Sequence, residues 1–520
     1  FQFESHRASA KTVANDMNNP FDEPTNIYQV ERCDLCIVGA GIAGMNALYA
    51  ASQYLESAAK VILIDRQASI GGMWTHTYDY VRLHQPHRMF TAGNIPWAIN
   101  KPPAYLATKD EVLAHFEHCI EELRSKVSLK EYYGYVYEEH REIAIDQDYE
   151  AQIICSTNLS DAKPLLVKTK KCIKAFGFNV PENHPLPLSS SQVRSISPND
   201  DQVLGNELQQ SVAPVYVIGG GKTGMDTAHA LVSRFPDKDV SLIVGNGTIF
   251  ASRDISFPNG LKRWFGPPTT LQYFMQLCRQ YTGDNPEEVF EKFRVDRSVH
   301  LKDTGRQYMF GVLSSEENET ITNGIEELIS DYVIDVEDID GQPVIKFKSG
   351  ETKPVAPGSW FINCTGYVLR DELDYEPFIS PHGTVVSVQP TSGIHFLTTF
   401  AAYFLTHLFY LGELGKLPLY EMDYPALLAK DKVAFPFAAM TQVLYNITLI
   451  ISVVPSKVMA DCGLDFDRWF PMYRRIIGGL KLQRNRKRFS QSYKNTLDTI
   501  RERYDIRCGE LVNQEPSKTY

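Results

Sequence analysis

The feature that most constrains this chain is a glycine-rich turn with the pattern GxGxxG, which occurs twice, at residues 39–44 and 219–224. Each turn follows a short apolar run and precedes a segment with the residue pattern of a helix. A strand, a tight turn, a helix and a second strand make up a unit with parallel strands. We expect strands at 36–38, 61–64, 215–218, 240–244 and 360–363, and helices at 45–55, 111–127 and 225–235. The sequence therefore predicts two nucleotide-type units about a domain apart.

The first turn contains Gly39, Gly41 and Gly44. Glycine at these places allows a tight turn, close approach to a pyrophosphate and close packing of the helix on the strand. The free N–H groups of the following helix then face the phosphates. Asp65 ends the second strand and is placed to bond ribose hydroxyls, with Arg66 beside it. The alternative is a glycine-rich turn of an unrelated α/β fold, which the acid at this spacing disfavours.

A second glycine motif, Gly71-Gly72-Met73-Trp74, follows shortly after Asp65. Small residues let the backbone approach a ligand, and a tryptophan can pack beside a flat ring system. Here the sequence resembles the flavin-containing monooxygenase family, whose FAD domain carries GGxW at this place. The next stretch, residues 78–87, is similar to that of the plant auxin-forming members. The resemblance implies FAD as a cofactor, with Gly72, Met73 and Trp74 near it.

The resemblance also draws attention to Leu83 and His84, in the stretch expected to line the flavin pocket. Many family members have an asparagine at the position of His84, where it helps to hold NADP and the oxygenated flavin. The resemblance thus implies a catalytic role for His84. The alternative is a histidine that forms a hydrogen bond within the FAD pocket.

The second turn contains Gly219, Gly221 and Gly224, with Lys222 and Thr223 between them. No carboxylate follows the strand at 240–244. An acid there would repel a 2′-phosphate, so its absence favours NADPH over NADH. Family members place an arginine close to the position of Gly245, and this chain does not. Lys222 and Arg253 are the candidate cations.

A third segment, Cys364-Thr365-Gly366-Tyr367, resembles the family's ATGY sequence, where the chain returns to the FAD domain. Thr365 and Gly366 are therefore expected at the cofactor. The resemblance covers about residues 31–370. One departure concerns the family's linker fingerprint, because Phe178 and His184 keep its spacing without its glycine, and a second alignment puts Arg194 in place of its histidine. The reaction subtype stays open.

We expect an α/β fold of two interleaved Rossmann-type domains with a C-terminal helical extension. The expected divisions are an arm at 1–30, an FAD-binding domain at 31–205 and 350–420, an NADP-binding domain at 206–349, and the extension at 421–520. The resemblance implies an FAD- and NADPH-dependent monooxygenase that moves one oxygen atom of O2 to a small-molecule nitrogen, sulfur or carbonyl through a C4a-hydroperoxyflavin. The alternatives are an FAD-dependent reductase without oxygenation and a non-catalytic flavin-fold binding protein.

Composition bears mainly on partners and location. A net charge of −11 disfavours nucleic acid. Nine scattered cysteines favour free thiols in a reducing compartment, so we expect a cytoplasmic protein, no metal site and a structural role for the Cys33 and Cys36 pair. The apolar segment 434–454 carries too many polar residues for a membrane span, and is expected to be buried or interfacial. Together with the basic run 484–488 it could contact an anionic membrane surface; the alternative for that run is a solvated helix face.

Overall fold

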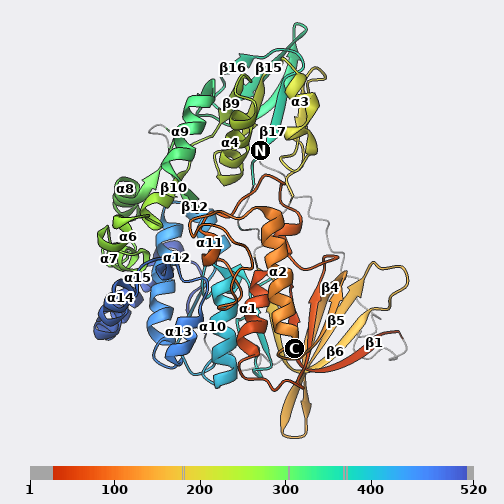
Figure 1. Ribbon diagram of the computed structural model, residues 1–520, viewed down its shortest axis with the longest axis vertical. Coiled ribbons are helices and arrows are strands. Elements are labelled where there is room, and N and C mark those ends of the chain that lie inside the picture. The colour runs from red at the N-terminus through yellow and green to blue at the C-terminus, as the bar shows by residue number, and fades with distance from the viewer. Residues whose placement is uncertain are drawn as a thin grey trace.

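The computed structural model describes residues 27–177, 180, 182–301, 305–366, 369 and 373–511. It has two main sheets, one mixed and one parallel, each near a glycine-rich turn, and a helical part that lies beside both (Figure 1). Most of the predicted arm at 1–30, and both Phe178 and Tyr367, lie outside the described residues.

The first sheet has the strand order β3-β2-β1-β6-β5-β4, with β18 pairing with β6. Strands β3, β2, β1, β6 and β18 are parallel, whereas β4, β5 and β6 form an antiparallel meander. The strands are β1 (Gln29–Val38), β2 (Lys60–Asp65), β3 (Ser128–Tyr133), β4 (Tyr135–Ile145), β5 (Asp148–Thr157), β6 (Leu165–Ala175) and β18 (Val385–Val388). Strand β18 follows the second unit in the sequence, so the chain returns from that unit to complete the first sheet.

Side chains on β1 pack into two different hydrophobic cores, because successive residues point to opposite faces of the sheet. Leu35 and Ile37 lie in the core that includes helix α1, whereas Cys36 and Val38 lie in the core that includes the meander. Three helices, α1 (Ile42–Ala51), α2 (Lys109–Arg124) and α10 (Thr398–Leu411), cover the first of these faces (Figure 1). Burial on both faces explains the unbroken apolar runs of these strands.

The second sheet, in the order β13-β9-β8-β17-β7, is parallel throughout. Its strands are β7 (Arg194–Ile196), β8 (Val215–Ile218), β9 (Val240–Ile243), β13 (Glu327–Ile329) and β17 (Trp360–Asn363), and α4 (Lys222–Arg234) and α9 (Ser315–Gly324) pack together on it. An antiparallel sheet covers the other face, formed by β14 (Val333–Ile339), β15 (Gln342–Phe347) and β16 (Thr352–Pro354). The expected fold class, two interleaved Rossmann-type units, is confirmed.

Helix starts differ from the sequence-based expectation by a few residues. Helix α2 begins at Lys109 rather than at 111 because the Thr108 side chain and Glu111 form a capping box. Helices α1 and α4 begin directly after Gly41 and Gly221, within the turns themselves. The glycines are therefore part of the helix starts, which brings the helix N-termini close to the strand ends.

The helical part combines an insertion in the second unit with the C-terminal segment, and the two share one core. The insertion contains β10 (Ile249–Ser252), α5 (Arg253–Ser256), α6 (Leu261–Phe265), α7 (Thr270–Leu277), α8 (Pro286–Arg297), β11 (Ser298–Val299) and β12 (Tyr308–Leu313). The C-terminal segment contains β19 (Tyr420–Met422), α11 (Tyr424–Lys430), α12 (Ala434–Ile450), α13 (Ser456–Asp461), α14 (Met472–Arg484), α15 (Arg486–Tyr504) and β20 (Cys508–Glu510). The helical extension therefore packs on an insertion that the sequence analysis did not separate.

Helix α12 contains most of the apolar segment 434–454 and is buried along nearly its whole length. Its polar residues have partners within the protein: Gln442 donates to the carbonyls of Gly393 (2.6 Å) and Tyr420 (2.7 Å), and Asn446 donates to that of Ile394 (2.9 Å). These bonds explain polar residues in an apolar helix. The segment is a core helix, so the expected membrane contact does not arise from it. Among the described residues, no helix is long and apolar enough to cross a bilayer.

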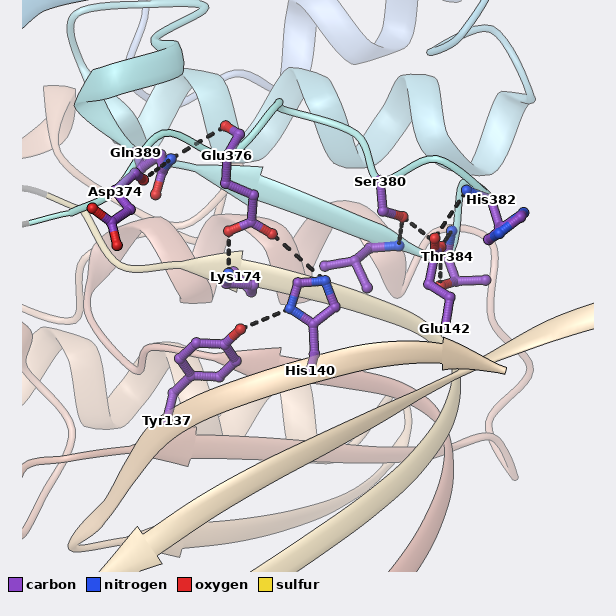
Figure 2. A network of polar contacts seen from close by, with 11 residues as sticks. Tyr137, His140, Glu142, Lys174, Asp374, Glu376, Ser380, His382, Thr384 and Gln389 are labelled. Atoms are coloured by element: carbon purple, nitrogen blue, oxygen red, sulfur yellow. Dashed lines mark hydrogen bonds and ion pairs between the residues drawn. The ribbon is translucent and has the colours of Figure 1, made fainter. Parts of the chain in front are cut away.

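A buried charge pair connects the returning chain to the meander. Lys174 on β6 is only 4% exposed and forms an ion pair with Glu376, which also lies 3.6 Å from His140 Nε2 on β4 (Figure 2). The Tyr137 hydroxyl lies 2.7 Å from Nδ1 of the same His140 ring. Breaking such a pair leaves a buried charge without compensation.

Glu142 makes a second connection, a few residues along β4. Its carboxylate accepts hydrogen bonds from the hydroxyls of Ser380 and Thr384, both at 2.6 Å, and from backbone N–H groups of residues 382 and 384 (Figure 2). These donors hold the pKa of Glu142 below its usual value although burial opposes them. The segment before β18 is thus fixed by charged groups of the first unit.

Candidate dinucleotide sites

The first turn has the geometry that a pyrophosphate site needs. Gly39 has φ +111°, and a Cβ atom there would lie 2.3 Å from the carbonyl oxygen of Ala175. A Cβ atom on Gly44 would lie 1.7 Å from the Gly39 carbonyl oxygen. Only glycine allows this approach, so the N-terminus of α1 meets the end of β1 at close range.

Asp65 holds this turn in place from the end of β2. It is 7% exposed, and its carboxylate accepts hydrogen bonds from the backbone N–H groups of Ala40 (2.5 Å) and Gln67 (2.8 Å). Burial raises the pKa of Asp65, and the two backbone bonds oppose that rise. A carboxylate has about four acceptor positions, so capacity remains for ribose hydroxyls. Arg66 follows it and is exposed.

The Gly71–Trp74 segment crosses directly over the first turn. Gly72 has φ +55°, and a Cβ atom there would lie 3.0 Å from Gly41 Cα. Trp74 is buried and packs against Phe90 with ring centroids 5.9 Å apart, whereas Met73 is 41% exposed. The structure therefore brings Gly41 and Gly72 together, as a shared ligand site requires, and places Trp74 in the core beside it.

The second turn repeats the first. Gly219 has φ +131° and approaches the carbonyl of Cys364, while a Cβ atom on Gly224 would lie 1.9 Å from the Gly219 carbonyl oxygen. A Cβ atom on Gly221 would meet nothing within 4 Å. The N-terminus of α4, with Lys222 and Thr223 in its first turn, is thus open toward a ligand.

At the end of β9, the ring of an aromatic residue from another segment lies where many such units have an acidic side chain. Gly245 has φ +59°, and a Cβ atom there would lie 2.5 Å from the Tyr332 ring. The Asn246 backbone N–H donates to the Tyr332 hydroxyl at 3.3 Å, and Lys348 Nζ lies 5.4 Å from the ring centroid. Sequence reasoning missed Tyr332 and Lys348 because they come from a turn and a sheet about ninety residues further along the chain. Only the pairing of β13 with β9 brings them there.

The stretch that contains His84 docks on helix α4. The Tyr78 hydroxyl donates to Asp226 (2.8 Å), and the Tyr80 hydroxyl lies 2.8 Å from Thr227 Oγ1. Leu83 is fixed by a bond from its N–H to the carbonyl of Ala107 (3.0 Å). The FAD-side loop and the NADP-side helix are therefore joined by specific hydrogen bonds.

His84 lies at this junction and is half-buried. Burial lowers its pKa to about 3, with the cations of Lys222 and Arg253 adding to the effect. Its imidazole is therefore neutral at physiological pH, with one donor and one acceptor nitrogen. Its backbone carbonyl accepts a hydrogen bond from Arg253 Nε at 2.8 Å.

Both predicted cations are paired with carboxylates. Lys222 forms an ion pair with Asp226, and Arg253 forms one with Glu317 at 2.8 Å. Burial alone would raise the pKa of Glu317, but Arg253 and Lys222 outweigh it and hold that pKa at about 2. Arg253 Nη2 is buried and has no hydrogen-bond partner among the described residues. Lys222, Asp226 and Glu317 border a cavity of about 320 Å³ between the loop and the helix.

The remaining predicted residues lie at the end of β17. Thr365 donates from its N–H (3.1 Å) and its hydroxyl (2.6 Å) to Asn363 Oδ1, and a Cβ atom on Gly366 would lie 3.4 Å from Asn183 Oδ1. Thr365 and Gly366 therefore lie beside the linker between the units. Arg194, one alternative for the fingerprint histidine, instead stacks on Trp360 and pairs with Glu207.

The cysteine side chains have the properties of structural rather than redox-active thiols. All nine are buried free thiols, and burial raises the pKa of Cys33 to about 12. A thiol held protonated is a poor nucleophile. The Cys33 and Cys36 pair is therefore structural, as its position suggested.

Two successive units with this turn geometry can each bind a dinucleotide, as expected of an oxidoreductase that uses FAD and a nicotinamide dinucleotide. Residues 33–256, which contain both turns, match the family model described as pyridine nucleotide-disulphide oxidoreductase. An uncharacterised protein of Mycobacterium tuberculosis is 24% identical over 420 residues, which cover 75% of this chain and 70% of that protein.

Solved structures with a similar fold include a flavin-containing monooxygenase from Stenotrophomonas maltophilia, with 14% identity and a TM-score of 0.43 over 73% of this chain and 98% of that one. A polycyclic ketone monooxygenase from Thermothelomyces thermophila has 13% identity and a TM-score of 0.48 over 90% of each chain. A bacillithiol disulfide reductase from Staphylococcus aureus has 10% identity and a TM-score of 0.43 over 74% of this chain and 99% of that one. The matched structures thus include two monooxygenases and a disulfide reductase.

Proposed function

We propose that the protein is an FAD- and NADPH-dependent monooxygenase that transfers one oxygen atom of O2 to a small-molecule nitrogen, sulfur or carbonyl. The observation that carries this proposal is the junction of the units, where the loop with His84 is bonded to helix α4. Bound FAD would supply the oxygen-transfer chemistry. The protein's tasks are then to bind, to orient and to exclude water.

Residues of the first unit would hold FAD. The N-terminus of α1, with Gly39, Gly41 and Gly44, suits the pyrophosphate, and Asp65 suits the adenosine ribose. Gly72 approaches the same point from the crossing segment. Thr365 and Gly366, at the end of β17 in the second sheet, would contact the FAD from across the junction of the units.

Residues of the second unit would hold NADPH. The open N-terminus of α4, with Gly221, Lys222 and Thr223, suits its pyrophosphate. The unpartnered Nη2 of Arg253 is a buried donor that a bound nucleotide could satisfy. Lys348, beside Tyr332, is a cation that could face the 2′-phosphate, and it also interacts with the carboxylate of Asp331.

His84 would act where the two cofactors meet. A neutral imidazole can donate one hydrogen bond to a bound nicotinamide or to reduced flavin and accept another. That role matches the polar-lined, water-poor pocket that oxygen transfer needs. A reductase does not transfer oxygen to a substrate, so it needs no such donor to prevent the release of H2O2.

The test is the H2O2 released per NADPH oxidised by FAD-loaded His84→Ala. We expect the variant to consume NADPH but to release about one H2O2 for each, with little oxygenated product. His84→Asn, which keeps a donor and an acceptor, should restore most of the coupling. If His84→Ala remains fully coupled, the proposed role of His84 is wrong. If the wild-type protein oxidises NADPH and oxygenates no amine, thioether or ketone, the reductase alternative is favoured.

A further inference from the structure

Helix α14 presents its apolar residues to solvent. Met472, Ile476, Ile477 and Leu480 recur at the spacing of one helical face, and each is more than half exposed, from 51% at Ile476 to 64% at Met472. The opposite face, which is buried, carries Arg474, Gly478 and Leu482. An amphipathic helix usually buries its apolar face, whereas α14 exposes this apolar face and buries the face that includes Arg474.

The contacts of the inner face fix this orientation. Arg474 donates to the carbonyls of Arg263 (3.1 Å), Gly266 (3.2 Å) and Pro267. A Cβ atom on Gly478 would already lie 3.2 Å from Gln272 Nε2. Rotation of the helix to bury its isoleucines would break the arginine bonds and force larger side chains into this contact. The exposed apolar face is thus built into the fold.

Helix α6 extends the same surface from the insertion. Leu261 is 78% and Phe265 is 81% exposed, and Trp264 stacks on Tyr473 with ring centroids 6.5 Å apart. The two helices lie at the same edge of the helical part, away from the meander (Figure 1). We call this surface the α6/α14 face; it consists of Leu261, Phe265, Met472, Ile476, Ile477 and Leu480. Trp264 and Tyr473 lie between its two parts.

The sequence around α14 is rich in basic residues, and Asp465, just before the helix, pairs with Arg475 at 3.7 Å. No acidic residue occurs between Asp467 and Asp498, whereas Lys481 and Arg484 lie on α14 and a basic run, 486–488, follows. Lys262 and Arg263 add positive charge from α6. The whole chain has a net charge of −11, so this surface is locally opposite in sign to the rest.

We infer that the α6/α14 face seats the protein on the surface of a lipid bilayer that contains anionic lipids. Apolar side chains of a short helix can enter the interfacial region, while Trp and Tyr favour its boundary and Lys and Arg attract anionic headgroups. A second copy of the chain fits less well, because symmetric pairing would bring each basic rim against the same basic rim. The attachment lies on the surface, since the apolar helix α12 is buried in the core.

Vesicle flotation of the full FAD-loaded chain tests this inference. We expect the protein to float with vesicles of phosphatidylcholine and phosphatidylserine and to remain below with phosphatidylcholine alone. Ile477→Glu and Phe265→Glu should each reduce the bound fraction by about tenfold, because each places a carboxylate in the interface. Val212→Glu is the matched control, because Val212 is 99% exposed and lies in the second unit, before β8. It should float like the wild type.

Each variant should keep its flavin and its vesicle-free NADPH oxidation, which shows that it is folded. Three results would overturn the inference: no flotation of the wild type, equal flotation with phosphatidylcholine alone, or normal flotation of Ile477→Glu. A dimer in light scattering that Ile477→Glu converts to monomer, without vesicle binding, would assign the face to a second copy instead.

Discussion

The two dinucleotide units share one backbone design but differ in what faces their turns. In both, the third glycine approaches the carbonyl of the first, and a neighbouring strand passes so close that the first glycine can carry no side chain. In the first unit, the Gly71–Trp74 segment crosses Gly41. In the second unit, Gly221 meets nothing within 4 Å. One site is thus closed over by the chain, as suits a tightly held cofactor, and the other is open, as suits a dinucleotide that comes and goes.

The units also differ at the end of the second strand. Asp65 ends β2 with a buried carboxylate, whereas β9 runs into Gly245 and the Tyr332 ring. A carboxylate accepts from ribose hydroxyls and repels a phosphate at the same place. The shared GxGxxG turn would thus place the pyrophosphate in both units. Segments distant in sequence would determine how tightly each dinucleotide is held and which nicotinamide dinucleotide is preferred.

The largest expected effect is on the closed site. Gly41→Val adds a branched side chain where only Gly72 and a pyrophosphate approach, and its φ of −81° permits the substitution locally. We expect a folded but nearly colourless protein whose FAD content falls by at least about tenfold. Flavin absorbance per protein measures this. A yellow Gly41→Val protein with full FAD occupancy would contradict the assignment.

The sheet that carries the closed site also depends on the charge pair of Lys174 and Glu376 (Figure 2). Glu376→Gln leaves the buried ammonium of Lys174 without its carboxylate, so the free energy of unfolding should fall by about 3 kcal/mol. Urea denaturation of the holoenzyme measures the loss. The control is Glu376→Gln combined with Lys174→Met, which removes the unpaired charge and should recover most of the stability. An unchanged midpoint in the single variant would show that the pair contributes little.

The open site should respond without loss of flavin. Gly221→Val meets no protein atom within 4 Å of its Cβ, so only the nucleotide is obstructed. We expect the KM for NADPH to rise by about thirtyfold, or ~2 kcal/mol, with the FAD content unchanged. Steady-state kinetics on yellow protein check this. Gly224→Ala is a useful contrast, because its Cβ would lie 1.9 Å from a backbone oxygen and should prevent folding of the unit.

The smallest effect concerns the choice between NADPH and NADH. Lys348→Ala removes the cation beside Tyr332, and a charge-assisted bond to a 2′-phosphate contributes about 1.5–3 kcal/mol. We expect the ratio of kcat/KM for NADPH to that for NADH to fall by about tenfold, the lower end of that range. Arg253→Ala, measured in parallel, tests the cation that the sequence predicted. If neither variant changes the ratio, neither residue contacts the phosphate.

Periodicity and glycine placement were sufficient to predict much of the fold. The strands at 215–218 and 360–363 have the predicted bounds, and helices α1, α2 and α4 are displaced by only a few residues. The displaced starts have a local cause, since capping and tight turns depend on individual side chains such as Thr108. The apolar segment 434–454 was expected to be buried or interfacial, and its helix α12 is buried.

What the sequence by itself determined is the local backbone: glycines that can adopt positive φ, apolar runs that form strands, and an acid at Asp65 that can bond a ribose. Only the tertiary structure decided which segments meet these elements. It joined Tyr332 to Gly245, Arg253 to His84, and α6 to α14, and it buried α12 while exposing Ile476 and Ile477. The physical reason is that a turn forms through bonds between near neighbours, whereas burial and ion pairing depend on contacts between residues far apart in the chain.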